Sequence, residues 1–114
     1  MLIATLAYVM IAFCYDGDTC TTTTGERVRL ACIDTPELVG KRAKPVQARA
    51  ARDYLRELVV GKEVSIRRIT EDRYGRTVGE LFVGPTNVQQ EMVISGHAHI
   101  FRRYAHQCQL FQGQ

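Results

Sequence analysis

The run of residues 27–37 constrains the fold of this 114-residue chain more than any other stretch. Its first seven residues form two alternating sets: Val28, Leu30 and Cys32 on one side, and Arg27, Arg29, Ala31 and Ile33 on the other. Side chains of a β-strand alternate between two faces, so one set can pack while the other points elsewhere. The run therefore predicts a strand that holds Arg29 on a rigid element.

Two carboxylates flank a proline at the end of this strand, in Asp34-Thr35-Pro36-Glu37. Pro36 has no N–H to donate and keeps Thr35 extended, so the strand is expected to end here. Asp34 and Glu37 would then leave the sheet edge together, near Arg29. The alternative is an ordinary strand-to-turn sequence without chemistry, and this run alone leaves both interpretations open.

Short β-rich segments and two helical segments make up the rest of the chain. Turn signals separate strands at 8–13, 19–24, 27–33, 64–66 and 77–83, and helical spacing follows Pro45 and Asn87. Three strands, a helix, two strands and a helix are the element order of a five-stranded Greek-key barrel of the OB type. We therefore predict a β-rich α+β fold with two helices, in which residues 1–114 form a single domain.

The two helices have recognisable ends. The first is expected to begin at Pro45 and stop at Gly61, and the second to begin at Asn87 as N-cap and stop at Gly96. For the second helix, Val88, Met92 and Val93 are predicted to face inward. The first helix is predicted to turn six residues toward the core: Val46, Ala50, Tyr54, Leu55, Leu58 and Val59.

Positive charge is concentrated in the middle of the chain. The net charge is +3, and most lysines and arginines fall between residues 41 and 76. This pattern favours a polyanionic partner. A solvated helix face, in which acids are interspersed with the bases, explains the excess equally well.

The four cysteines, Cys14, Cys20, Cys32 and Cys108, lack the close pairs of a zinc site. An even count permits disulfides in an exported protein, and three complete pairings can be drawn. At least two of the cysteines in strand-like runs are interpreted as small buried apolar residues. The apolar residues 1–13 lack the basic start of a signal peptide and are too short to span a membrane, so they predict a first strand, with or without the tail of a signal.

Acids and arginines suggest the chemistry of a site. The acids come from two separate turns, and no cysteine or histidine accompanies them. Oxygen-only ligands suit a hard cation such as Ca²⁺, whereas guanidinium groups match phosphate oxygens in a two-pronged contact. The candidate residues are Asp16, Asp18, Asp34, Glu37, Arg29 and Arg76.

Three blocks of sequence resemble motifs of the staphylococcal nuclease (thermonuclease) family. They are Asp16-Gly17-Asp18-Thr19, Val28-Arg29-Leu30 through Asp34-Thr35-Pro36-Glu37, and Asp72-Arg73-Tyr74-Gly75-Arg76-Thr77. Residues 87–96 followed by Tyr104 resemble the second helix of that family and the tyrosine-bearing segment after it. The resemblance covers residues 8 to 104.

The resemblance implies a role for each matching residue. Asp18 and Asp34 would bind Ca²⁺ directly with the backbone carbonyl of Thr35, and Asp16 would act through water. Glu37 would orient or deprotonate the attacking water. Arg29 and Arg76 would bind the phosphate, and Tyr74 and Tyr104 would contact the nucleotide.

By this resemblance the chain is a calcium-dependent phosphodiesterase. It would cleave DNA and RNA, single-stranded or locally open, and leave 3′-phosphate ends. The resemblance also implies a secreted or periplasmic monomer that does not enter a membrane. The alternatives are a nucleic-acid-binding module without catalysis and a truncated product that no longer folds stably.

The sequence departs from the family pattern in several places. Arg102 and Arg103 stand where the best-known member has aromatic and aliphatic residues, and the chain stops before the third helix of the family. The three histidines, His97, His99 and His106, are expected to be surface or half-buried polar residues. In the family the third strand lies near the segment after the second helix, so the resemblance makes Cys32 and Cys108 the expected disulfide pair if the protein is exported.

Overall fold

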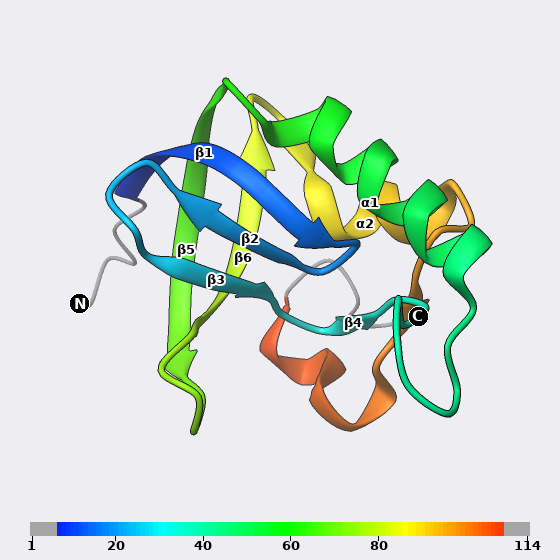
Figure 1. Cartoon of the computed structure of the whole chain (residues 1–114). Coiled ribbons are helices and arrows are strands. Elements are labelled where there is room, and N and C mark those ends of the chain that lie inside the picture. Colours follow the sequence, from blue (N-terminus) through cyan, green and yellow to red (C-terminus); the bar gives the residue numbers. More distant parts are fainter. Residues whose placement is uncertain (1–6, 109–114) are drawn as a thin grey trace.

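Five strands curl into a closed barrel in the computed structural model, which describes residues 7–108. They are β1 (Ala7–Asp16), β2 (Thr19–Thr22), β3 (Arg27–Leu30), β5 (Glu63–Glu71) and β6 (Thr77–Val83). Neighbours pair antiparallel in the order β3-β2-β1-β5-β6, and a parallel pairing of β3 with β6 closes the barrel (Figure 1). The predicted OB-type α+β barrel is confirmed.

Shorter elements decorate this barrel. In Figure 1, α1 and α2 lie at one end of the barrel and η1 lies below β4. The strands β4 and β8 form a separate two-stranded ribbon. These elements are β4 (Ile33–Asp34), α1 (Pro45–Val59), β7 (Thr86–Asn87), α2 (Val88–Ile94), β8 (His99–Ile100) and the 3₁₀ helix η1 (Arg102–Gln107).

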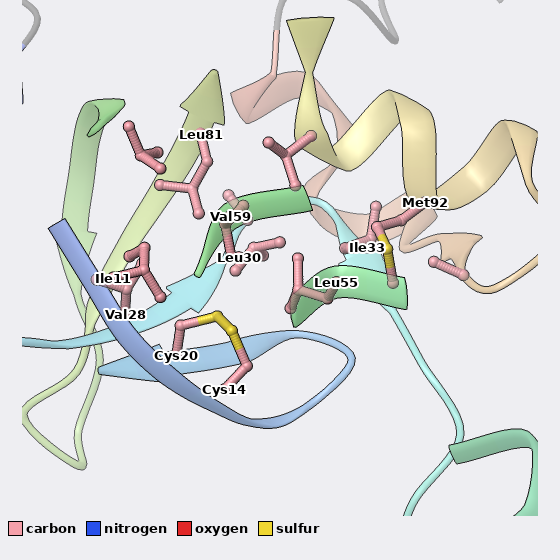
Figure 2. Close-up of a cluster of buried hydrophobic side chains, with 14 of the residues drawn as sticks. Ile11, Cys14, Cys20, Val28, Leu30, Ile33, Leu55, Val59, Leu81 and Met92 are labelled. Atoms are coloured by element: carbon pink, nitrogen blue, oxygen red, sulfur yellow. A yellow bond between two sulfur atoms is a disulfide. The ribbon is translucent and has the colours of Figure 1, made fainter. Parts of the chain in front are cut away.

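The core lies between the barrel wall and the two α-helices. Figure 2 shows side chains from strands and helices meeting there, among them Ile11, Leu30, Leu55, Leu81 and Met92, all at most 1% exposed. Burying a large aliphatic side chain stabilises a fold by about 1.5–3 kcal/mol. This core therefore provides a rigid support for the loops at the ends of its strands.

Helix α1 has the predicted bounds, and Tyr54, Leu55, Leu58 and Val59 face the core as predicted, but its first half turns other residues inward. Its buried residues are Ala48, Ala51, Leu55 and Val59, whereas Val46 and Ala50, predicted to be buried, are exposed. The small alanines allow a close approach to the turn between β1 and β2. A Cβ on Gly17 would lie only 2.8 Å from the Cβ of Ala51, so this contact requires glycine.

The predicted strand 27–33 is interrupted. β3 ends at Leu30, and Cys32 adopts a left-handed backbone with φ +72° before the chain resumes as β4. The strand alternation no longer applies after Leu30, and Ala31 and Ile33 are both buried although the alternation placed them on the face away from Leu30. β4 then pairs with β8 instead of continuing the barrel.

All four cysteines form disulfides, so the interpretation that at least two of them are only small apolar residues is wrong. The expected Cys32–Cys108 pair is confirmed, with Cα atoms 6.3 Å apart. Cys14 and Cys20 form the second disulfide across β1 and β2.

Helix α2 begins as predicted. The side chain of Asn87 accepts a hydrogen bond from the backbone N–H of Gln90 at 2.9 Å, and Gly96 follows the helix with φ +83°. No helix within residues 7–108 is long and apolar enough to cross a membrane. The expectations about a signal remnant at residues 1–6 and about the end of the chain at 109–114 lie outside the described residues.

Candidate active site

Asp18 joins the turn between β1 and β2 to the segment after β4. It is 7% exposed. Its Oδ2 accepts hydrogen bonds from the backbone N–H of Thr35 at 3.2 Å and from the Thr35 hydroxyl at 2.9 Å. The packing of Gly17 against α1 and Thr35 fixes this turn. Two segments far apart in the sequence therefore meet at one carboxylate.

Burial raises the pKa of Asp18 to about 7. The positive charge of Arg29 lowers this pKa and the nearby Asp16 carboxylate raises it further. Asp16 is held in place because its Oδ1 accepts a hydrogen bond from the backbone N–H of Asp18 at 3.0 Å. A desolvated carboxylate beside a second acid is stabilised in its charged form by a nearby cation.

Arg29 bridges two of the predicted acids from its position on β3. Its Nη1 lies 3.4 Å from Oδ2 of Asp18, and its Nη2 lies 3.9 Å from Oδ1 of Asp34. Nη1 also donates to the carbonyl oxygen of Leu30 at 2.6 Å. Arg29 thus lies near Asp34 as the sequence predicts, and Asp18 from the β1–β2 turn joins them.

A cavity of about 520 Å³ opens beside Arg29. Its lining combines the barrel surface around β3 and β6, the β5–β6 turn and the segment around η1. Four of the predicted site residues line it, namely Arg29, Arg76, Tyr74 and Tyr104. Among the other residues of the lining are Asp72, Phe101 and Gln107, none of which was a predicted site residue.

Asp72 orients Arg76 toward this cavity. Its Oδ2 accepts a hydrogen bond from Nε of Arg76 at 2.7 Å, and its Oδ1 accepts from the backbone N–H groups of Tyr74 and Arg76. Burial alone raises the pKa of Asp72, but these hydrogen bonds outweigh it and hold the pKa below its ordinary value. The Arg76 guanidinium carbon lies 5.4 Å from the centre of the Tyr74 ring.

Arg27, the first residue of β3, contacts the turn between β5 and β6. Its guanidinium donates to the carbonyl oxygen of Tyr74. Gly75 in the same turn has φ +78°, a conformation that residues with a Cβ rarely adopt. The turn that carries Tyr74 and Arg76 is therefore fixed both by its own backbone and by β3.

The segment around η1 forms another wall of this cavity. The segment η1 buries none of its own residues. It is attached through the Cys32–Cys108 disulfide and through Arg67, which donates to the carbonyl oxygen of Gln107 and pairs with the buried Glu80 at 2.9 Å. These links place Tyr104 against the cavity.

Glu37 stands apart from the other predicted residues. Its side chain is exposed and makes no hydrogen bond or ion pair with any residue in the range 7–108; only its carbonyl oxygen accepts a bond, from the N–H of Lys44 at 3.0 Å. The structure therefore does not bring Glu37 into contact with Arg29 or Asp34.

The donor atoms near Arg29 suit a hard cation in their chemistry. Within residues 7–108, no three or more acid, histidine or cysteine side chains are grouped to hold a metal ion. Two carboxylates, Asp18 and Asp34, lie within 4 Å of one guanidinium, so positive charge already compensates them. Calcium accepts such incomplete sets because carbonyl oxygens and water complete its shell.

Asp72 is the site residue that the sequence could have revealed. An aspartate at the start of a turn such as Asp-Arg-Tyr-Gly typically accepts a hydrogen bond from the backbone N–H two residues later, as Asp72 does from Tyr74. Here the same carboxylate also pairs with the side chain of Arg76. Phe101 and Gln107 carry no such signal, because tertiary contacts bring them to the cavity: Phe101 donates its N–H to the carbonyl oxygen of Cys32, and Arg67 holds Gln107.

A closed barrel with acids and arginines beside one cavity defines an SNase-like OB-fold domain. Residues 27–113 match the model of the family described as staphylococcal nuclease homologue, and the chain belongs to this family.

Curated relatives agree with this assignment. An uncharacterized endonuclease of Escherichia coli O157:H7 is 37% identical over 79 residues, which are 68% of this chain and 48% of that protein. An uncharacterized endonuclease of Haemophilus influenzae is 35% identical over 106 residues, covering 87% of this chain and 55% of the relative. The staphylococcal-like nuclease CAN1 of Arabidopsis thaliana is 36% identical over 84 residues, covering 74% and 24%. The chain thus spans about half or less of the length of these relatives.

Proposed function

We propose that this chain is a calcium-dependent nuclease that hydrolyses phosphodiester bonds of DNA and RNA, in single-stranded or locally open regions, and leaves 3′-phosphate ends. The observation that carries the proposal is the placement of Arg29. It lines the same cavity as Arg76 and is ion-paired with Asp18 and Asp34. One phosphate in this cavity could therefore meet both guanidinium groups next to the acids.

The two arginines stabilise the charge that builds on phosphorus. Asp72 occupies Nε of Arg76, which leaves the two terminal nitrogens for a two-pronged contact with phosphate oxygens. Arg29 is held through the Leu30 carbonyl on its rigid strand. Donors fixed in this way cost little reorganisation during the reaction.

The acids near Arg29 would hold the metal ion. Asp18 and Asp34 provide anionic oxygens and Thr35 a carbonyl oxygen, while Asp16 acts through water. When bound, calcium supplies a Lewis acid that stabilises the negative charge of the transition state. Arg29 compensates the same two carboxylates, so its guanidinium becomes available to phosphate when a cation takes over that role.

Glu37 and the aromatic residues complete the proposed mechanism. The exposed carboxylate of Glu37 is free to orient or deprotonate the attacking water. Tyr74 and Tyr104 line the cavity with exposed rings, which offers flat surfaces against a base or sugar.

We also propose that the protein acts as a monomer outside the cytoplasm, secreted or periplasmic. Its four cysteines form two disulfides, and disulfides persist mainly in oxidising compartments.

A second candidate function is a nucleic-acid-binding module without catalysis. The exposed carboxylate of Glu37 makes no hydrogen bond or ion pair with Arg29 or Arg76, and this favours the module because a binding cavity needs no group to activate water. The two candidates share the cavity and differ in turnover.

Product analysis separates the two. The protein is incubated with end-labelled single-stranded DNA in calcium or in excess chelator, and the product termini are mapped. Calcium-dependent cleavage with 3′-phosphate ends supports the nuclease. Binding without cleavage in calcium supports the module, and 5′-phosphate ends contradict the proposed bond polarity.

A further inference from the structure

A second, smaller hollow of about 300 Å³ lies between the start of α1 and the segment from α2 to β8. None of the predicted site residues lines it. Its lining consists of Pro36, Lys44, Gln47, Ala50, Gly96, His97 and His99.

The hollow is adjacent to the candidate active site. His99 on β8 pairs with Asp34 on β4, so one hollow-lining residue lies directly opposite a proposed metal ligand. Ile33 and Phe101 from the same two segments line the larger cavity, whereas Pro36 and His99 line the smaller one. The β4–β8 ribbon therefore runs between the two hollows.

The lining is suited to an anion. Lys44 carries three donors and a positive charge, a neutral histidine ring keeps one N–H donor, and Gln47 adds an amide. No carboxylate lines the hollow, and the first turn of α1 contains no acid. Any anionic group that enters thus meets donors, while the neighbouring carboxylates of Asp34 and Glu37 lie outside the lining.

Packing explains one of these residues but not the others. The ring of His97 lies against Tyr54, with centroids 4.7 Å apart. Lys44 and His99 are exposed, and neither side chain makes a hydrogen bond or ion pair with the residues between 7 and 108. The adjoining loop presents Lys41 and Arg42, which are also exposed.

We propose that this hollow binds a second phosphate of the same nucleic-acid strand, beyond the β4–β8 ribbon from the phosphate held by Arg29 and Arg76. This inference rests on the proposed function and deepens it, because it predicts that the protein binds a strand through more than one phosphate. A phosphodiester strand fits better than an isolated small anion because it can reach the larger cavity at the same time.

Binding without cleavage tests this inference independently of activity. Fluorescence anisotropy in excess chelator compares labelled oligothymidylate of eight nucleotides with the dinucleotide, which has one phosphodiester. The variants are Lys44→Gln and His99→Gln. The matched control is Lys62→Gln, which removes the same charge from an exposed residue beyond the far end of α1.

We expect Lys44→Gln to weaken binding of the octanucleotide by about threefold to tenfold, while the affinity for the dinucleotide stays at the wild-type value. Loss of one phosphate contact should also reduce the slope of log affinity against log salt by about 0.7 for a single strand. His99→Gln should weaken octanucleotide binding less than Lys44→Gln, because it removes a donor without a full charge.

Three results would overturn the inference. They are equal affinities and salt slopes for Lys44→Gln and Lys62→Gln, equal loss of affinity for both oligonucleotides, and displacement of the octanucleotide by polyglutamate as efficiently as by unlabelled oligothymidylate. Circular dichroism confirms that each variant is folded. If wild-type protein binds as expected but never cleaves in calcium, the proposed function fails while the second phosphate site stands.

Discussion

Each of the two arginines of the cavity, Arg29 and Arg76, is paired with an aspartate that helps to orient its guanidinium group. Asp72 fixes Nε of Arg76 at 2.7 Å, and Asp18 lies 3.4 Å from Arg29. The sequence identified both arginines through their motifs. It could not show that Arg76 is held by its own turn, because the pairing depends on the backbone path from Asp72 to Arg76.

Replacing Arg76 by lysine keeps the charge but removes the two-pronged contact. We expect the turnover of single-stranded DNA to fall by about a hundredfold, with a smaller change in KM, because the contact strengthens as charge builds on phosphorus. Steady-state kinetics measures both parameters. Arg49→Lys on the exposed side of α1 is the control, and near-wild-type turnover of Arg76→Lys would exclude a catalytic role.

Asp18 has a structural task as well as the proposed metal task, so its variants need to be compared in pairs. Asp18→Asn keeps an oxygen that can accept from Thr35, whereas Asp18→Ala leaves the Thr35 N–H without its acceptor. An unpaired buried donor costs about 1–3 kcal/mol. Both variants should lose calcium binding in calorimetry, and the alanine variant should have the lower Tm. Unchanged calcium affinity of Asp18→Asn would remove this residue from the metal shell.

At the scale of elements, turn residues carried most of the information. Gly25, Gly61, Pro45 and Asn87 mark the ends of strands and helices, and those ends are close to the observed ones. The sequence does not indicate the break at Cys32, because cysteine, unlike glycine or asparagine, is not typical of a positive φ. The β4–β8 ribbon and η1 were missed because two-residue strands and a 3₁₀ turn show no periodicity.

The two disulfides should differ in their contribution to stability. Cys32–Cys108 spans 76 residues and Cys14–Cys20 spans 6. The loop-closure entropy of the unfolded chain predicts about 4.5 kcal/mol for the longer loop and about 2 kcal/mol for the shorter one. Denaturant unfolding of the two double serine variants measures both values. A greater loss for the Cys14 and Cys20 variant would contradict this account, since all four positions are buried.

Glu26, the residue before β3, binds side chains of two further strands and makes the closure of the barrel sensitive to acid. Its carboxylate accepts from Arg68 on β5 and from Thr77 on β6. The hydrogen bond from Arg68 is the main cause that holds the pKa of Glu26 below its ordinary value of 4.5, against the effect of burial. Its stabilisation is therefore fully present above that pH and is lost as the pH falls through the folded pKa.

We expect the Tm difference between wild type and Glu26→Gln to be largest at pH 6 and to shrink below pH 4.5. Thermal melts between pH 3 and pH 6 measure this difference. A difference that stays constant over this range would show that the charge of Glu26 does not contribute through these pairs.

At the scale of the whole molecule, barrel closure assembles the site. The parallel pairing of β3 with β6 brings Arg29 near the turn that carries Arg76, and the Cys32–Cys108 link brings Tyr104 to the same cavity. The motifs predicted the members of this set. Their convergence, the position of Glu37 outside it and the second hollow depend on tertiary structure, which no local pattern encodes.

The central claim is that Arg29 and Arg76 act on one phosphate, and a double-mutant cycle tests it most directly. Turnover of single-stranded DNA in saturating calcium is measured for wild type, Arg29→Lys, Arg76→Lys and the double variant. The effects of two groups that act on one transition state are not additive in free energy. We therefore predict that the turnover of the double variant falls by a much smaller factor than the product of the two factors measured for the single variants. Losses that multiply, or a wild type without calcium-dependent turnover, would contradict the account.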